Sequence, residues 1–425
     1  MGKKPTTRPI LPLLISNWVL GIGIIEYPIG TPRPTFSFIY STTLLVIYCT
    51  TSIMIRDEIF RVSIILKNYT VPMTIVFYTN IFLTISIVTL GWYRSKGLRR
   101  YVAKAAVADD LMERIGIPNN HGKMLRAVAG QVIKGFFLVI VLIAIISVIV
   151  LVEDSPLQTK ILISTVMSFP LLTMFVSDAM FTSCVRCACY RFTELNKVLK
   201  TVLTSTHAFP QHKRVCSSVF ESGGQDSNFV IDNVSQRKNP AVIVKLAKEI
   251  HLQLISACQE INNTYGLHLV LSIMFAFAVI TGNMYLCYMS SRNSNIPHYV
   301  LVKTMVVSGI WIVYYGMKIC YFSIVCGCCT ENSIKTGDYI NELYDEPSTT
   351  NETKLKIRQF NMQLIQKPCK FTAWGFVDLN CHLIQVMIGT ITTYLMILIQ
   401  LGTTTYVADD SYYKYLKLFN NSPTY

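Results

Sequence analysis

Residues 135–152 read GFFLVIVLIAIISVIVLV, an unbroken run without a charged side chain. Folded as an α-helix, this run is about 27 Å long, close to the thickness of the hydrocarbon core of a bilayer. Six further predominantly apolar blocks of similar length lie at 36–55, 71–92, 161–181, 266–289, 301–325 and 376–402. The sequence therefore predicts an all-α, polytopic membrane protein with seven transmembrane helices.

The composition excludes a water-soluble protein. Of the 425 residues, 52% are hydrophobic and only 15% are charged, whereas charged residues make up roughly 25% of an ordinary globular chain. The net charge of +14 would be compatible with nucleic-acid binding, but the basic residues lie in the segments between the apolar blocks. In that position they report membrane orientation, so we expect no nucleic-acid partner.

The distribution of basic residues predicts the orientation. If the N-terminus is cytosolic, the inside segments hold 29 of the 38 Lys and Arg residues and the outside segments hold 8. Cytosolic loops of membrane proteins are enriched in Lys and Arg. We therefore expect a multi-pass protein of the plasma membrane with a cytosolic N-terminus and an extracellular C-terminus, the reverse of a G-protein-coupled receptor.

The segments outside the spans are predicted from length and periodicity. A shorter block at about 10–30 is interrupted by prolines and glycines, which favours a re-entrant or interfacial element. Apolar residues recur every three or four positions beyond the fourth span and before the fifth, which predicts helical extensions. The polar stretch between these extensions has no period and is predicted to be a flexible loop.

These expectations divide the chain into successive regions. They are a cytosolic N-terminus with the re-entrant or interfacial segment at 1–35, helices one to four at 36–181, cytosolic helical extensions and a flexible loop at 182–265, helices five and six at 266–325, a cytosolic segment at 326–375, helix seven at 376–402, and an extracellular tail at 403–425. At the N-terminus, Gly2 and Thr6 match the myristoylation pattern, which leaves that modification open.

The sequence contains no motif of an enzyme. A phosphate-binding loop, a zinc-hydrolase HExxH and a GxSxG elbow are all absent from it. Two cysteine clusters stand at the predicted cytosolic ends of the fourth and sixth spans, namely Cys184, Cys187 and Cys189, and Cys326, Cys328 and Cys329. A zinc site needs four ligands that converge. We interpret the clusters as packing or palmitoylation sites, and predict no metal and no cofactor.

Asp178 lies inside the predicted fourth span and Lys318 inside the sixth. Counting from the outer ends of the helices places both near the cytosolic interface. They either form a salt bridge or extend separately to the lipid headgroups.

The most specific pattern lies in the last span, where Thr393-Tyr394 is followed by five apolar residues and Gln400. This pattern resembles the signature of the insect gustatory receptor family, which is Thr-Tyr, five hydrophobic residues and Gln-Phe. Leu401 stands where the family has Phe. Further similar features are Leu195-Asn196 within RFTELNKVL, His251-Leu252, and the NNTY run at 262–265. The resemblance covers about 180–402.

Membership of that family would imply a ligand-gated cation channel in the lipid membrane. The channel would be a homotetramer or a heterotetramer with related receptors, and its seventh helix would line the pore. The resemblance implies that Gln400 and Leu401 form the pore gate, while Thr393 and Tyr394 position the pore helix. Thr393 and Gln400 are seven residues apart, as are Tyr394 and Leu401, so these residues lie on two adjacent helical stripes. In the alternative, Gln400 bonds across a helix interface inside one subunit.

The expected ligand is a small-molecule tastant. Its binding site needs polar groups that converge on an aromatic wall. The outer halves of the spans offer Tyr78, Asn80, Ser164, Ser168, Thr281, Asn283, Tyr285, Trp311 and Tyr315. Members of the large sugar-sensing clade typically have Glu after the Thr-Tyr pair, and this chain has Leu395. Fructose-type, bitter and amino-acid ligands stay open.

Two other classes of membrane protein fit the sequence less well. A metabotropic seven-helix receptor would have an extracellular N-terminus, and the chain lacks Asp-Arg-Tyr after the third span and Asn-Pro-x-x-Tyr in the seventh. A secondary transporter would favour an internal repeat of spans, which the sequence does not show.

Overall fold

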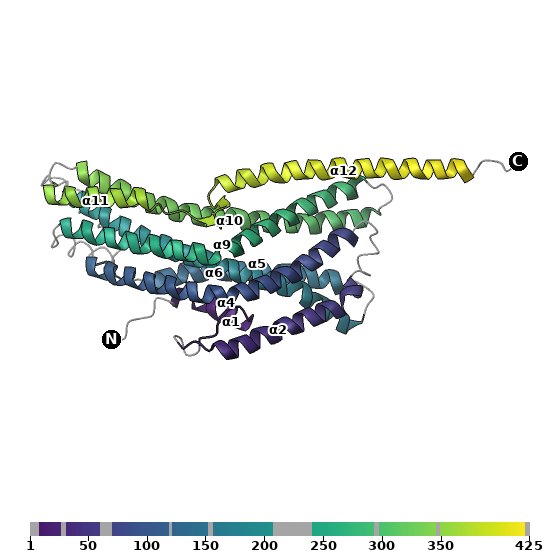
Figure 1. Cartoon of the computed structure of the whole chain (residues 1–425), viewed down its shortest axis with the longest axis horizontal. Helices are drawn as coiled ribbons and strands as arrows, with labels where there is room; N and C mark the ends of the chain where they lie inside the picture. The colour runs from purple at the N-terminus through teal and green to yellow at the C-terminus, as the bar shows by residue number, and fades with distance from the viewer. Residues whose placement is uncertain are drawn as a thin grey trace. The chain divides into compact units, whose positions relative to one another are not determined.

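The structure, a computed structural model, describes residues 8–26, 31–59, 70–118, 121–151, 156–206, 240–292, 297–345 and 349–420 (Figure 1). The described helices are η1 (Arg8–Ile10), α1 (Leu11–Val19), α2 (Pro34–Met54), α4 (Thr70–Ile115), α5 (His121–Leu151), α6 (Leu157–Thr206), α9 (Pro240–Arg292), α10 (His298–Asp345), α11 (Asn351–Gln366) and α12 (His382–Asn420). Two short strands, β1 (Thr372–Ala373) and β2 (Val377–Asp378), form an antiparallel hairpin.

The predicted all-α fold with seven spans is confirmed. Within the described residues, seven helices are long and apolar enough to cross a membrane, and they are α2, α4, α5, α6, α9, α10 and α12. Each of them covers most of one of the seven apolar blocks. Large apolar side chains on these helices are exposed in the isolated chain, among them Phe137, Ile140 and Val148 on α5. Such a surface is compatible with lipid or with another helix, but not with water.

The N-terminal block forms only a short helix. With nine residues, α1 is about 14 Å long, less than half of the hydrocarbon core. The chain then turns through Gly21 and Gly23, which have φ angles of +70° and +93°. A Cβ at Gly23 would lie 2.7 Å from Ser95 Oγ, so the close approach of this turn to α4 requires glycine. A re-entrant or interfacial placement of this element stays a prediction.

The helices α6 and α9 each continue without a break through the segments for which the sequence predicts helical extensions. Their 50 and 53 residues correspond to about 75–80 Å, more than twice the hydrocarbon thickness. The sixth span also continues as a helix, since α10 runs on to Asp345. The predicted flexible loop between α6 and α9 and the candidate myristoylation site at Gly2 lie outside the described residues.

The last helix differs from its predicted bounds at both ends. The apolar run starts at Phe376, but α12 begins at His382, because Val377 and Asp378 pair with β1. The hairpin turns at Trp374 and Gly375, which have φ angles of 49° and 79°. The side chain of Asn380 then accepts a hydrogen bond of 3.0 Å from the His382 N–H, which starts the helix. At the other end α12 continues to Asn420, so most of the expected tail is helical.

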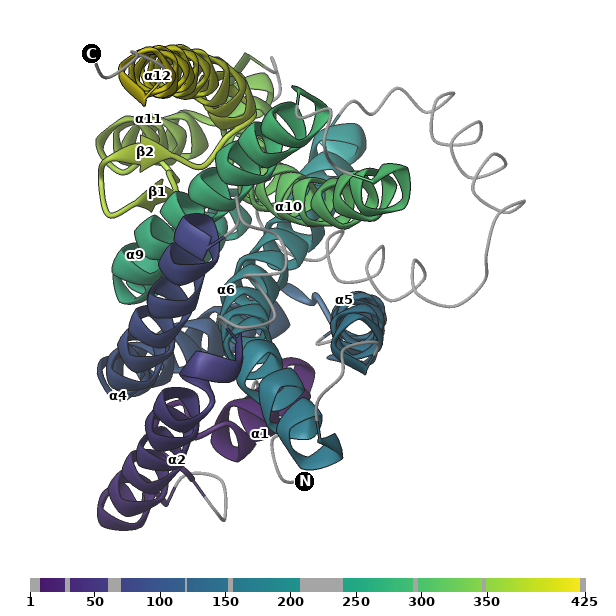
Figure 2. The same ribbon diagram turned by 90° about the vertical axis from the view of Figure 1, so that its right-hand side faces the viewer.

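The chain divides into two compact units. Unit 1 comprises Met1–Val270 and Ile324–Leu379, and unit 2 comprises Leu271–Ser323 and Asn380–Tyr425. In unit 1, α6 packs against α1, α2, α4 and α5, and Figure 2 shows it between α4 and α5. Its side chains Met180, Phe181 and Phe192 are completely buried. The helix α6 is therefore the centre of the core of unit 1.

Polar contacts also join α4 and α6 within unit 1. The Arg191 guanidinium donates two hydrogen bonds to the Asp109 carboxylate, of 2.7 and 2.9 Å, and both side chains are buried. The Tyr101 hydroxyl donates to the Cys184 carbonyl at 2.7 Å. Because these groups are removed from solvent, each depends on its partner for its hydrogen bonds.

Candidate functional site

The signature residues of α12 all lie on parts of the helix that the single chain leaves uncovered. Thr393, Tyr394, Gln400 and Leu401 are exposed, and the exposed fractions of Tyr394 and Leu401 are 51% and 60%. Only 11% of the most apolar 18-residue segment of α12 is buried, against 56% of the corresponding segment of α6. Among the seven candidate spans, α12 is the least covered by its own chain.

Local hydrogen bonds explain how threonines are tolerated in this apolar helix. The hydroxyls of Thr390, Thr392 and Thr393 donate to carbonyls one turn earlier, at 2.7, 2.9 and 2.9 Å. A hydroxyl bonded in this way needs no water or partner helix. Thr393 therefore fits a pore lining and a helix interface equally well.

Within unit 2, Tyr394 contacts α9. Its ring meets the ring of Phe277 edge to face, with centroids 5.5 Å apart. Such pairs contribute roughly 0.5–1.5 kcal/mol beyond the burial of area. A role of Tyr394 in positioning the seventh helix stays a prediction. The sequence did not single out Phe277, because a ring contact between residues 117 positions apart has no local pattern.

Unit 2 also holds an aromatic cluster, which we define as Phe275, Trp311, Tyr314 and Tyr315. The rings of Trp311 and Tyr315 stack, with centroids 6.0 Å apart and an interplanar angle of 23°. Tyr315 also meets Phe275 edge to face at 5.6 Å. The structure thus brings together two of the predicted ligand residues, and these two form part of an aromatic wall.

A cation lies beside this aromatic cluster. The ammonium group of Lys318 is 5.6 Å from the ring centroid of Tyr315 and 5.9 Å from that of Phe322. Attraction between a cation and an aromatic face contributes about 0.5–2 kcal/mol. The spacing of Trp311, Tyr315 and Lys318, at i, i+4 and i+7, is a signal in the sequence that could have predicted one helical face.

The other predicted ligand residues of unit 2 lie on α9. Thr281 is buried, and its hydroxyl has no hydrogen-bond partner among the described residues. Asn283 is half-buried and donates to the Val279 carbonyl at 2.8 Å, while Tyr285 is half-buried. Of these three, Thr281 has the free hydrogen-bonding capacity that a ligand site needs.

Four predicted ligand residues belong to unit 1. Tyr78 is exposed and contacts Phe77, and Asn80 is half-buried on the same helix, α4. On α6, the hydroxyl of Ser164 is 2.6 Å from that of Ser147, whereas Ser168 is buried with no hydrogen-bond partner for its hydroxyl among the described residues. A ligand site that contains these residues stays a prediction.

A buried polar pair in unit 1 gives Asp178 a partner that the sequence did not predict. The Nε2 atom of His268 on α9 lies 2.8 Å from the carboxylate of Asp178 on α6, and both side chains are buried. The guanidinium of Arg94 lies 5.1 Å from the ring centroid of Tyr265, one turn before His268. The histidine inside the apolar run GLHLVLS was the available signal.

Comparison with known proteins gives a consistent result. A family model described as 7tm chemosensory receptor matches residues 25–404. The putative gustatory receptor 28b of Drosophila melanogaster is 27% identical over 315 residues, which are 71% of this chain and 64% of that protein. The putative gustatory receptor 2a of the same species is 28% identical over 157 residues, 33% of this chain and 36% of that protein. The chain thus spans less than two thirds of the length of both relatives.

A solved structure has the same fold. The insect olfactory receptor OR5 from Machilis hrabei, in complex with eugenol, superposes with a TM-score of 0.60 and covers 93% of this chain and 97% of its own. The two sequences are 13% identical, so this likeness concerns the fold.

Proposed function

Because the chain belongs to the 7tm chemosensory receptor family, a class of receptors rather than enzymes, we propose that it is a gustatory receptor that acts as a ligand-gated cation channel. It detects a small-molecule tastant at the plasma membrane. Four copies, or this chain with related receptors, surround a central pore. The N-terminus lies in the cytosol and the C-terminus outside.

The observation that carries this proposal is the exposure of the signature residues on α12. An apolar helix whose Tyr394, Gln400 and Leu401 are exposed in the single chain is suited to face other subunits around an axis. One such helix cannot enclose a pore, so the function requires assembly. The likeness in fold to an olfactory receptor solved with eugenol supports a small-molecule ligand.

The gate would work through two kinds of contact. A ring of Leu401 side chains excludes water when the pore is narrow, and dewetting blocks ions. A ring of Gln400 amides forms hydrogen bonds between subunits in the closed state. A ligand opens the pore when it binds the open state more tightly than the closed state.

The ligand would bind among the membrane helices, against the aromatic cluster of unit 2. Trp311 and Tyr315 supply a stacked aromatic surface, and the Thr281 hydroxyl supplies an unused polar group. Aromatic walls with few polar groups are typical of sites for small organic molecules.

The orientation separates this proposal from a metabotropic receptor. An epitope tag at the C-terminus is expected to bind antibody on intact cells, whereas a tag at the N-terminus should bind only after permeabilisation, because the basic loops remain in the cytosol. Surface immunofluorescence measures both. The two tagged chains serve as controls for each other, and an accessible N-terminus would rule out the channel topology.

The oligomeric state distinguishes the proposed channel from a transporter. Detergent-solubilised protein is expected to have the mass of four 48.1 kDa chains by light scattering. In planar bilayers, the same preparation should carry a conductance that rises with fructose-type, bitter or amino-acid ligands. A monomer that retains the ligand-evoked current would refute the pore, because a single α12 cannot enclose one.

A further inference from the structure

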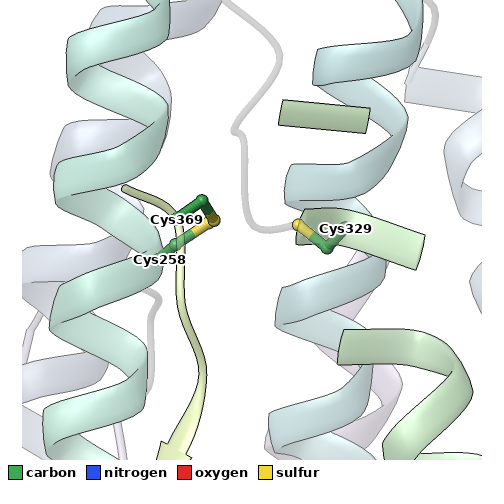
Figure 3. A group of neighbouring side chains, drawn as sticks. All are labelled: Cys258, Cys329 and Cys369. Atoms are coloured by element: carbon green, nitrogen blue, oxygen red, sulfur yellow. The ribbon is translucent and has the colours of Figure 1, made fainter. Parts of the chain in front are cut away.

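Three buried cysteines from three different segments meet in unit 1 (Figure 3). Cys258 lies on α9, Cys329 lies on α10, and Cys369 lies between α11 and β1. Their Sγ atoms are all within 4.8 Å of one another, and the exposed fractions of the residues are 1%, 0% and 6%. We call these residues the cysteine triad.

The spacing of the cysteine triad is close to that of a metal–thiolate site. With a Zn–S bond of about 2.3 Å, neighbouring sulfurs in a tetrahedral site are about 3.8 Å apart. Separations of at most 4.8 Å require the thiols to close by about 1 Å around an ion. Two of the three sulfurs are held by long helices, and small rotations of the side chains supply this movement.

The Ser333 hydroxyl lies beside the cysteine triad, within hydrogen-bonding reach of the Cys369 thiol. The Ser333 hydroxyl also lies 3.2 Å from the Nε2 atom of His251. Burial lowers the pKa of His251 to about 4, so this imidazole is neutral near pH 7. The thiolate is the form of cysteine that binds metals.

Packing alone and disulfide formation explain the cluster less well. Buried cysteines often act as small apolar side chains, but that role does not require three thiols from separate segments to face one another. A disulfide would use two of the three sulfurs, and every cysteine in the described residues is a free thiol. The basic-residue count also places this region in the reducing cytosol, where convergent cysteines more often bind metal.

We propose that Cys258, Cys329 and Cys369 bind a thiophilic d¹⁰ metal ion, either Zn²⁺ or Cu⁺, as thiolates. Binding releases the thiol protons of all three residues to water. Soft sulfur ligands select these two ions over harder ones. A zinc ion takes a fourth ligand, which is water in a site of these three residues alone.

The sequence did not group these residues. It placed Cys329 in a cluster with its neighbours on α10, whereas the structure joins it to residues 71 positions earlier and 40 positions later. The bound ion cross-links α9 and α10 to the segment that leads through the hairpin into α12. It thereby stabilises the folded form of unit 1, since a metal that binds only the folded state contributes its binding energy to folding.

The test is elemental analysis of the full-length chain, purified in detergent without chelators and without a histidine tag. About one Zn or Cu per chain is expected, and the element found identifies the ion. A mercurial reagent that caps thiolates should release this ion from the unmodified protein, which avoids any variant that fails to fold. Cys258→Ser and Cys369→Ser should each lower the content to below about one tenth of an ion.

The matched control is Cys381→Ser, because Cys381 is an exposed thiol shortly after the cysteine triad in the sequence. This variant should keep the full metal content. The proposal is overturned if the unmodified protein holds no Zn or Cu, if the control loses the ion as the triad variants do, or if peptide mass spectrometry finds two triad residues joined as a disulfide. None of these readouts depends on channel activity.

Discussion

Replacing Leu401 with alanine is expected to raise the current that flows without ligand by about threefold to thirtyfold. The smaller side chain widens the apolar ring and lowers the barrier to wetting. Gln400→Ala should act in the same direction, because it removes amide contacts between subunits that are each worth about 0.6–2 kcal/mol in lipid. Whole-cell recording, normalised to the amount of receptor at the surface, measures both effects.

The matched control is Ile388→Ala. Ile388 is an apolar residue of α12 with an exposed fraction of 62%, almost equal to the 60% of Leu401. At 100° per residue it lies on the opposite face of the helix from the Gln400 and Leu401 stripes. Its replacement should leave the basal current unchanged. If all three variants reach the surface with the current of the unmodified channel, Gln400 and Leu401 face lipid or a neighbouring helix, and the proposed gate is wrong.

The second large effect is on stability. Asp109→Ala is expected to lower the free energy of unfolding by about 3–5 kcal/mol, because it leaves the buried Arg191 guanidinium without its carboxylate. The melting temperature of the solubilised protein, followed by fluorescence-detected size-exclusion chromatography, should fall accordingly.

Two further variants make this result specific. Glu331→Ala removes an exposed ion pair with Lys335 on α10, so the melting temperature should stay close to that of the unmodified protein. The double variant Asp109→Leu and Arg191→Met should recover much of the loss, since an apolar pair of similar volume avoids the desolvation of both charges. A melting temperature for Asp109→Ala equal to that of the unmodified protein would show that the pair does not stabilise unit 1.

Much of the site could be predicted because its signals are local. The pattern from Thr393 to Gln400 lies within two helical turns, and its periodicity alone places the residues on adjacent stripes. The structure adds that the residues of these stripes are exposed in the single chain and that Tyr394 contacts Phe277. The grouping of Trp311, Tyr315 and Lys318 was also within reach, since it follows from spacing along one helix.

The sequence by itself determined the seven helices, their order and the continuation of α6 and α9 past their apolar blocks. Hydropathy and helical period act over about 20 residues, and a bilayer leaves few alternatives to a helix for such segments. These signals did not predict the hairpin. Its second strand belongs to the apolar run that starts at Phe376, so the run was assigned to the last helix, whereas α12 begins only after Asn380.

Only the tertiary structure decided which distant residues meet. Asp109 with Arg191, Asp178 with His268, and the cysteine triad join positions 40 to 111 apart along the chain. Such pairs depend on the rotation and height of whole helices against one another. These are set by the packing of many side chains around α6, and no local pattern records that packing.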